Sequence, residues 1–128
     1  MNNIHTITSI GLTSLQPDYS ADPVQMCKDV IYTLEEELNR NPKCVDSLRD
    51  WITGYQALSG VYLQEGKIEL AKQCLLIPHR SLLHMAKYNR GDHEQRHIAK
   101  EAMKLTLLPL LEFTKIYPLY DCSIQEIQ

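Results

Sequence analysis

The chain of 128 residues has the length of one domain, and its 44% apolar and 23% charged residues are typical of a folded protein. Its net charge of −3 argues against a general nucleic-acid binder, which needs a basic face to offset phosphate charge. No run reaches the ~18 apolar residues that a membrane-spanning helix requires, and residues 1–20 lack the segments of a secretory signal. We therefore expect a cytoplasmic protein whose partners include neither nucleic acid nor membrane.

The four cysteines lie far apart in the chain, at Cys27, Cys44, Cys74 and Cys122. No pair has the C-x-x-C spacing of a zinc ribbon or a thioredoxin-like site. On apolar helical faces a free cysteine behaves as a small hydrophobic residue. The positions of the cysteines therefore indicate that their thiols are reduced and form no disulfide.

Residues 1–21 are rich in Thr, Ser, Asn and Ile and show no helical period. We expect an extended arm or a disordered tail here. The functional alternative is a segment that docks on the domain or on a second subunit.

The first helix is predicted to begin at Asp22, which can cap it, with Pro23 in the first helical position and Gln25 completing a capping box. Apolar residues then recur at steps of three and four: Val24, Cys27, Ile31, Leu34 and Leu38. The helix should stop within residues 39–41, before Pro42.

A second helix is predicted to start at Asn41 and Pro42, by the same combination of cap and proline. Its apolar stripe contains Val45, Leu48, Trp51, Ile52, Tyr55, Leu58, Ser59 and Tyr62. Gly66 can supply the left-handed residue that ends the helix. The turn is short, so the next helix must run antiparallel.

The third helix has a regular seam formed by Ile68, Ala71, Leu75, Pro78, Leu82 and Met85. Pro78 lacks a backbone N–H, and we expect it to kink or restart the helix. The helix is predicted to end in residues 89–91, with Gly91 as its terminating residue.

The fourth helix is predicted to open at Asp92, with Gln95 completing a second capping box. Pro109 should kink it and Pro118 should end it, which leaves residues 119–128 as an irregular tail. The predicted fold is therefore all-α. Four antiparallel helices form an array or bundle over residues 22–118, and no strand of consequence is expected.

One stretch in the middle of the chain has the spacing of a known repeat: Tyr55-x-x-Leu58-Ser59-x-x-Tyr62, then Gly66, then Ala71-x-x-x-Leu75. It resembles the tetratricopeptide repeat, whose pattern is aromatic-x-x-Leu-small-x-x-Tyr, a turn, and Ala-x-x-x-large apolar. The resemblance implies a helical hairpin that binds other proteins. Within the stretch, Tyr55 stands where the family usually has Trp, Ser59 where it has Gly, and Leu75 where it has an aromatic residue. The chain departs further at Pro78 and Leu83, where the family has a small residue and a closing proline. A generic helical hairpin, which also needs a small residue at the crossing, is the alternative.

Residues 93–97, His-Glu-Gln-Arg-His, match the H-E-x-x-H pattern of zinc proteases, in which two histidines on one helical face bind zinc and the glutamate activates water. Here the pattern falls in the first turn of the predicted helix, between charged neighbours, where ligands are not held rigidly. A looser metal site would add His84 to His93 and His97. We predict no catalytic residue, no metal and no cofactor. A metal-binding protein or zinc hydrolase is the alternative.

The leading functional hypothesis is a small helical adaptor, chaperone or regulator that binds another protein or a second copy of itself. From Leu105 onward the last helix is apolar nearly all round, which indicates that something must cover it. We expect the interface with a partner or in a homodimer to contain Leu107, Leu110, Phe113, Tyr117 and Tyr120. The alternative is that these residues fill the chain's own core. A transcriptional regulator would need a helix that is basic on one face, and none is predicted.

Overall fold

The computed structural model describes residues 22–88 and 92–120. The helices are α2 (Pro23–Arg40), α3 (Val45–Gln64), α4 (Ile68–Tyr88) and α5 (His93–Ile116), followed by a short 3-10 turn, η1 (Pro118–Tyr120). The predicted all-α class is confirmed, because the described ranges contain four α-helices and no strand. The arm predicted at residues 1–21, the helix end predicted at Gly91 and most of the predicted tail lie outside these ranges.

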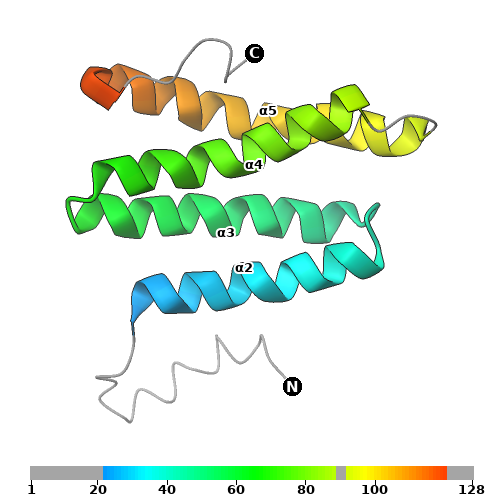
Figure 1. Cartoon of the computed structure of the whole chain (residues 1–128), viewed down its shortest axis with the longest axis horizontal. Helices are drawn as coiled ribbons and strands as arrows, with labels where there is room; N and C mark the ends of the chain where they lie inside the picture. Colours follow the sequence, from blue (N-terminus) through cyan, green and yellow to red (C-terminus); the bar gives the residue numbers. More distant parts are fainter. Residues whose placement is uncertain (1–21, 89–91, 121–128) are drawn as a thin grey trace.

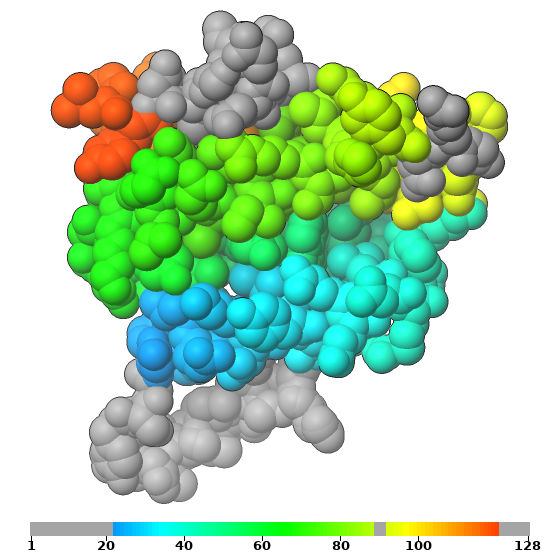
Figure 2. Space-filling model, viewed as in Figure 1, coloured from blue at the N-terminus to red at the C-terminus, as the bar shows by residue number. Residues whose placement is uncertain are grey.

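The helices lie side by side in the order of the chain, as Figure 1 shows. Each helix packs mainly against the next one, and α3 also touches α5, which runs in the same direction. In the described part of the chain α2 packs on α3 and makes no comparable contact with α4 or α5. The four described helices therefore form an open array rather than a closed bundle, with α2 and α5 as the edges of this array. Figure 2, seen from the same side, shows α2 along the bottom and α4 above it, with α5 visible mainly at its two ends.

The predicted helix starts at Asp22 and Asp92 are confirmed. The Asp22 carboxylate accepts a hydrogen bond from the Val24 N–H at 3.1 Å, and the Asp92 carboxylate accepts one from the Gln95 N–H at 2.9 Å. Each acidic side chain thereby satisfies a backbone donor that the first turn of a helix leaves without a partner. The side chain of Gln25 donates to Asp29 instead of completing a capping box.

The predicted start of the second helix at Asn41 and Pro42 is wrong, because α3 begins at Val45. Asn41 still belongs to the end of α2, since its N–H donates to the Glu37 carbonyl at 2.9 Å. The Cys44 N–H then donates to the Asn41 carbonyl at 3.1 Å, which closes a turn through Pro42. The asparagine and proline that suggested a helix start therefore form the turn between α2 and α3.

Gly66 ends α3 as predicted, with a φ angle of 76° that favours glycine. The Lys67 N–H donates to the Tyr62 carbonyl at 2.9 Å and the Gly66 N–H donates to the Leu63 carbonyl at 3.0 Å. These two bonds form a Schellman motif, which satisfies carbonyls at the end of the helix. The motif turns the chain directly into α4.

The two internal prolines do not divide their helices. Pro78 lies buried inside α4 and Pro109 lies inside α5, and each helix is continuous through its proline. Of the two outcomes predicted at Pro78, a kink or a restart, the restart is excluded by the continuous α4, and the kinks at Pro78 and Pro109 stay predictions. The predicted stop at Pro118 is confirmed, since α5 ends at Ile116 and Pro118 opens η1.

The core follows α3 and α4 and receives side chains from all four helices. Its largest fully buried apolar side chains are Ile31, Ile52, Leu76, Leu82 and Leu110. Burial of an aliphatic side chain of this size contributes about 1.5–3 kcal/mol to folding. The predicted stripe of α3 is confirmed except at Val45, which is 45% exposed because it begins the helix at the edge of the contact.

Two polar contacts and one glycine set the packing of α2 on α3. The Trp51 indole N–H donates to the Glu35 carboxylate at 3.1 Å, and the Ser47 hydroxyl donates to the Glu37 carboxylate at 3.0 Å. Gly54 lies against Ile31, and a Cβ atom at this glycine would be 3.0 Å from Ile31 Cγ1. The glycine therefore allows the two helices to approach closely.

Replacement of Gly54 by valine should destabilise the protein, because the added side chain would overlap Ile31. Overpacking of this kind costs about 1–3 kcal/mol. Gly60→Val is the matched control in the same helix, since a Cβ atom there meets nothing within 4 Å. Urea unfolding should show a clearly lower free energy of unfolding for Gly54→Val and no decrease for Gly60→Val. Equal stability of the two variants would contradict the close approach of α2 and α3.

Candidate functional site

The two histidines of the H-E-x-x-H pattern are not joined by a third metal ligand among the described residues. His93 is the first residue of α5, and both His93 and His97 are exposed. His84 is also exposed, and its ring lies against Tyr88, with ring centroids 5.0 Å apart. Across the described ranges, no three His, Cys, Asp or Glu residues come together in a way that could hold a metal ion. Nothing in the geometry therefore favours the zinc alternative.

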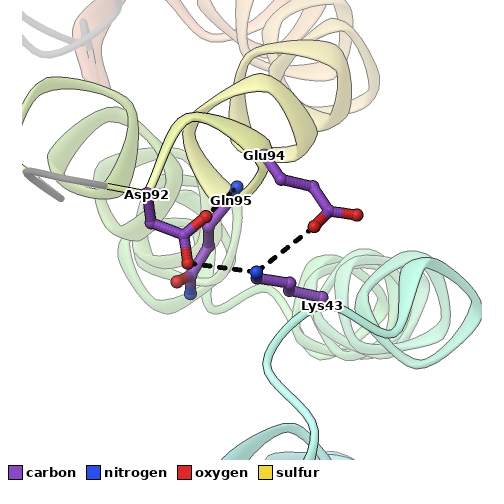
Figure 3. A network of polar contacts seen from close by, with 4 residues as sticks. All are labelled: Lys43, Asp92, Glu94 and Gln95. Carbon is purple, nitrogen blue, oxygen red and sulfur yellow. Dashed lines mark hydrogen bonds and ion pairs between the residues drawn. The ribbon is translucent and has the colours of Figure 1, made fainter.

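The glutamate of the motif takes part in an ion-pair cluster instead (Figure 3). The Lys43 Nζ atom lies 3.2 Å from a Glu94 carboxylate oxygen and 3.3 Å from an Asp92 carboxylate oxygen. Lys43 belongs to the turn between α2 and α3, so the cluster ties this turn to the start of α5. The hydrogen bonds to Glu94 and Asp92 raise the pKa of Lys43, and the Gln95 N–H together with Lys43 lowers the pKa of Asp92.

The stability of the protein should fall at low pH because of these carboxylates. The pKa values of Asp92, Glu69 and Glu101 lie below the ordinary values of 3.8 and 4.5 in the folded state. A carboxylate with a lowered pKa stabilises the fold above its unfolded-state pKa, and this contribution disappears as the pH falls through the folded-state value. The urea midpoint should therefore decrease below about pH 4.5. Asp92→Asn should make this decrease smaller. An unchanged dependence of the urea midpoint on pH would contradict the lowered pKa of Asp92.

A buried polar pair joins α4 to α5. His79 and Thr106 are both buried, and His79 Nδ1 lies 2.7 Å from Thr106 Oγ1. The Thr106 hydroxyl donates its single proton to the Met103 carbonyl at 3.1 Å, so His79 Nδ1 is the donor in the bond to Thr106. The pair has no local sequence signal, because its two residues are 27 positions apart in the chain.

Thr106→Val should destabilise the protein, because it keeps the shape of the side chain and removes the acceptor for His79. A buried polar group that loses its partner costs about 1–3 kcal/mol. Thr114→Val is the matched control, since the Thr114 hydroxyl bonds only within its own helix, to the Leu110 carbonyl at 3.0 Å. Thermal unfolding should show a clearly lower midpoint for Thr106→Val than for Thr114→Val, and equal midpoints would contradict the role of the pair.

The residues predicted to bind a partner are divided between the core and the surface. Leu110 is 0% exposed and Phe113 is 4% exposed, so the prediction that these two contribute to a partner surface is wrong. They lie on the side of α5 that packs against α4, and they fill the chain's own core. Tyr117 is half-buried with its ring against Phe113, while Leu107 and Tyr120 are exposed.

The exposed apolar surface of α5 lies on the side opposite the core. Leu105, Leu108 and Leu111 are 43%, 58% and 47% exposed, and successive members are three residues apart. We call the exposed side of α5 around these three leucines the outer face of α5. Sequence patterns could not single out these leucines, because the helix is apolar on nearly every side until the position of α4 is known.

A groove runs along the same part of α5, where it faces α3. Its volume is about 360 Å³, and its lining includes Ile52 and Thr53 from α3 with Leu105 and Leu108 from α5. The Gln56 side chain donates to the Leu105 carbonyl at 3.0 Å and joins the two helices at the groove. The groove and the outer face of α5 therefore share Leu105 and Leu108 and form one continuous surface.

The predicted hairpin of residues 55–75 is formed by α3 and α4 around the turn at Gly66. Its small residue, Ser59, lies at the crossing of the two helices, and its hydroxyl donates to the Ala71 carbonyl at 2.9 Å. The other apolar members of the pattern pack in or against the core, namely Tyr55, Leu58, Tyr62, Ala71 and Leu75. The geometry is that of a tight helical hairpin, which the tetratricopeptide repeat and a generic hairpin share.

Comparisons with known proteins give no match: no protein family, no curated protein and no solved structure is significantly similar to this chain. Kinship with the tetratricopeptide repeat therefore stays a prediction.

No helix in the described residues is long and apolar enough to cross a membrane. The three described cysteines, Cys27, Cys44 and Cys74, are free, and burial raises the pKa of the Cys74 thiol to about 11.

Proposed function

We propose that the protein is a helical interaction module, acting as an adaptor, chaperone or regulator without catalytic activity of its own. It binds another protein, or a second copy of itself, through the outer face of α5 and the adjoining groove. One observation carries this proposal, which is the set of exposed leucines on an edge helix of an open array. Contiguous exposed apolar surface is typical of interaction sites.

The chemistry of this surface supports protein binding over other functions. Leu105, Leu108 and Leu111 offer aliphatic contact area, and Arg49, Lys104 and the Gln56 side chain lie around them. An apolar centre with a polar rim is the usual composition of a protein–protein interface. The described residues that line the groove include no histidine, cysteine, aspartate or glutamate, so the groove lacks the side chains that most often bind a catalytic metal ion.

Leu108→Glu should abolish partner binding, because it places a charge at the centre of the apolar surface. Interface centres are where single substitutions have the largest effects, and we expect affinity to fall at least ~10-fold. The fold should be retained, since Leu108 is exposed in the structure. Leu70→Glu is the matched control, an exposed leucine on α4.

Affinity purification with tagged wild-type protein and both variants tests this proposal, with untagged copies of the same chain counted among the captured proteins. A partner that wild-type protein and Leu70→Glu retain and Leu108→Glu loses would support it. A partner retained equally by all three would contradict it. Circular dichroism should confirm that Leu108→Glu is folded.

A further inference from the structure

We propose that a second copy of this chain binds to the outer face of α5, with the two α5 helices antiparallel about a two-fold axis beside Leu108. The inference rests on the proposed function, because it names the partner of the same surface. Its basis is the order of charges around the exposed leucines.

Seven residues of α5 share the side that faces away from the core, because they follow one another at steps of three or one along the helix. In chain order they are Glu101, Lys104, Leu105, Leu108, Leu111, Glu112 and Lys115. All seven are exposed. The core residues Thr106, Leu110 and Phe113 project from the opposite side of the helix.

Read in opposite directions on two copies, these residues place opposite charges against each other. When two copies meet antiparallel about Leu108, a residue before Leu108 lies level with the residue equally far after Leu108 in the other copy. Lys104 then faces Glu112 of the second copy, and Glu101 faces Lys115. Each pair occurs twice because a two-fold interface is self-complementary. All four charge pairs are attractive.

The leucines obey the same symmetry. Leu105 of one copy lies level with Leu111 of the other, and Leu108 lies beside its own symmetry mate. The surface thus combines an apolar centre with charges at both ends.

A parallel arrangement of two α5 helices would not have this property. In a parallel two-fold pair each residue meets its own copy, so Lys104 would face lysine and Glu112 would face glutamate. Like charges across an interface oppose association. The charge order therefore selects the antiparallel pair.

The free chain leaves these charges available. Lys104 pairs with Glu101 of its own helix at 3.0 Å, and both side chains are exposed to solvent. Exposed ion pairs between neighbours on a helix are weak and exchange readily. One face of one helix buries less area than a standard interface, so we expect a dimer that dissociates on dilution.

The test is sedimentation velocity of the full-length chain from about 5 to 500 µM, a range suited to micromolar dimers. Wild-type protein should shift from monomer to dimer as its concentration rises. Lys104→Glu and Glu112→Lys should each weaken dimerisation ~10-fold, because each places like charges opposite one another twice. Lys87→Glu, the same charge change at an exposed site on α4, should dimerise as wild type does.

Mixing the two weakened variants makes the test specific for this geometry. In a dimer of one Lys104→Glu chain and one Glu112→Lys chain, the two introduced side chains face each other with opposite charges. The native Glu112 of the first chain then faces the native Lys104 of the second. Both contacts are attractive, so the mixture should dimerise at concentrations where neither variant does alone. Such rescue is not expected from a general loss of stability or from another binding mode.

Three results would overturn the proposal: a wild-type chain that is monomeric throughout, single variants that dimerise normally, or a mixture that stays monomeric. If wild-type protein is monomeric but a chain ending at residue 120 dimerises, the face is covered by the chain's own end, and the proposal also fails. The wild-type chain could instead be monomeric and bind another protein that only the Leu108→Glu variant fails to bind. In that case a second copy is excluded as the partner, and the proposed function stands. If Leu108→Glu changes neither dimerisation nor the capture of other proteins, both the dimer and the proposed function are excluded.

Discussion

Helix α3 is packed on two sides, and the positions of the other helices follow from this arrangement. On one side, Gly54 allows Ile31 of α2 to approach closely. On the other side, Ser59 donates to the Ala71 carbonyl of α4 in a buried contact. Small residues at both crossings bring the helix axes together, so larger side chains can interdigitate around them. α5 then packs on α4, and the Lys43 cluster ties the first turn of α5 to the turn between α2 and α3.

An array that grows in chain order has two edge helices, and the apolar content of α5 exceeds what its contacts with α4 and α3 bury. Leu110 and Phe113 face α4 and complete the core, while Leu105, Leu108 and Leu111 remain exposed. In a closed bundle another helix would cover them, but within the described ranges α2 makes no comparable contact with α5. The proposed interaction function follows from this uncovered side. The alternation of charges around it supports a second copy as the partner.

Much of the fold could be predicted from sequence because its signals are local. Asp22, Asp92 and Gly66 act on backbone groups within a few residues, and their predicted roles are confirmed. The combination of Asn41 and Pro42 was misleading because the same residues serve a turn as well as a helix start. The site could be predicted only in part. Which leucines of α5 are exposed depends on where α4 lies, and Leu110 and Leu108 cannot be told apart by composition.

The most direct test of the account is disulfide formation between copies at its central residue. In an antiparallel pair Leu108 lies beside its own symmetry mate, so a cysteine pair at this point is the one brought closest to the Cα separation of about 4.4–6.8 Å that a disulfide needs. Mild oxidation of Leu108→Cys should give a covalent dimer on a non-reducing gel. Wild-type protein, which carries the same four native cysteines, and Leu70→Cys should stay largely monomeric. Equal cross-linking of all three proteins, or none by Leu108→Cys, would contradict the antiparallel contact through the outer face of α5.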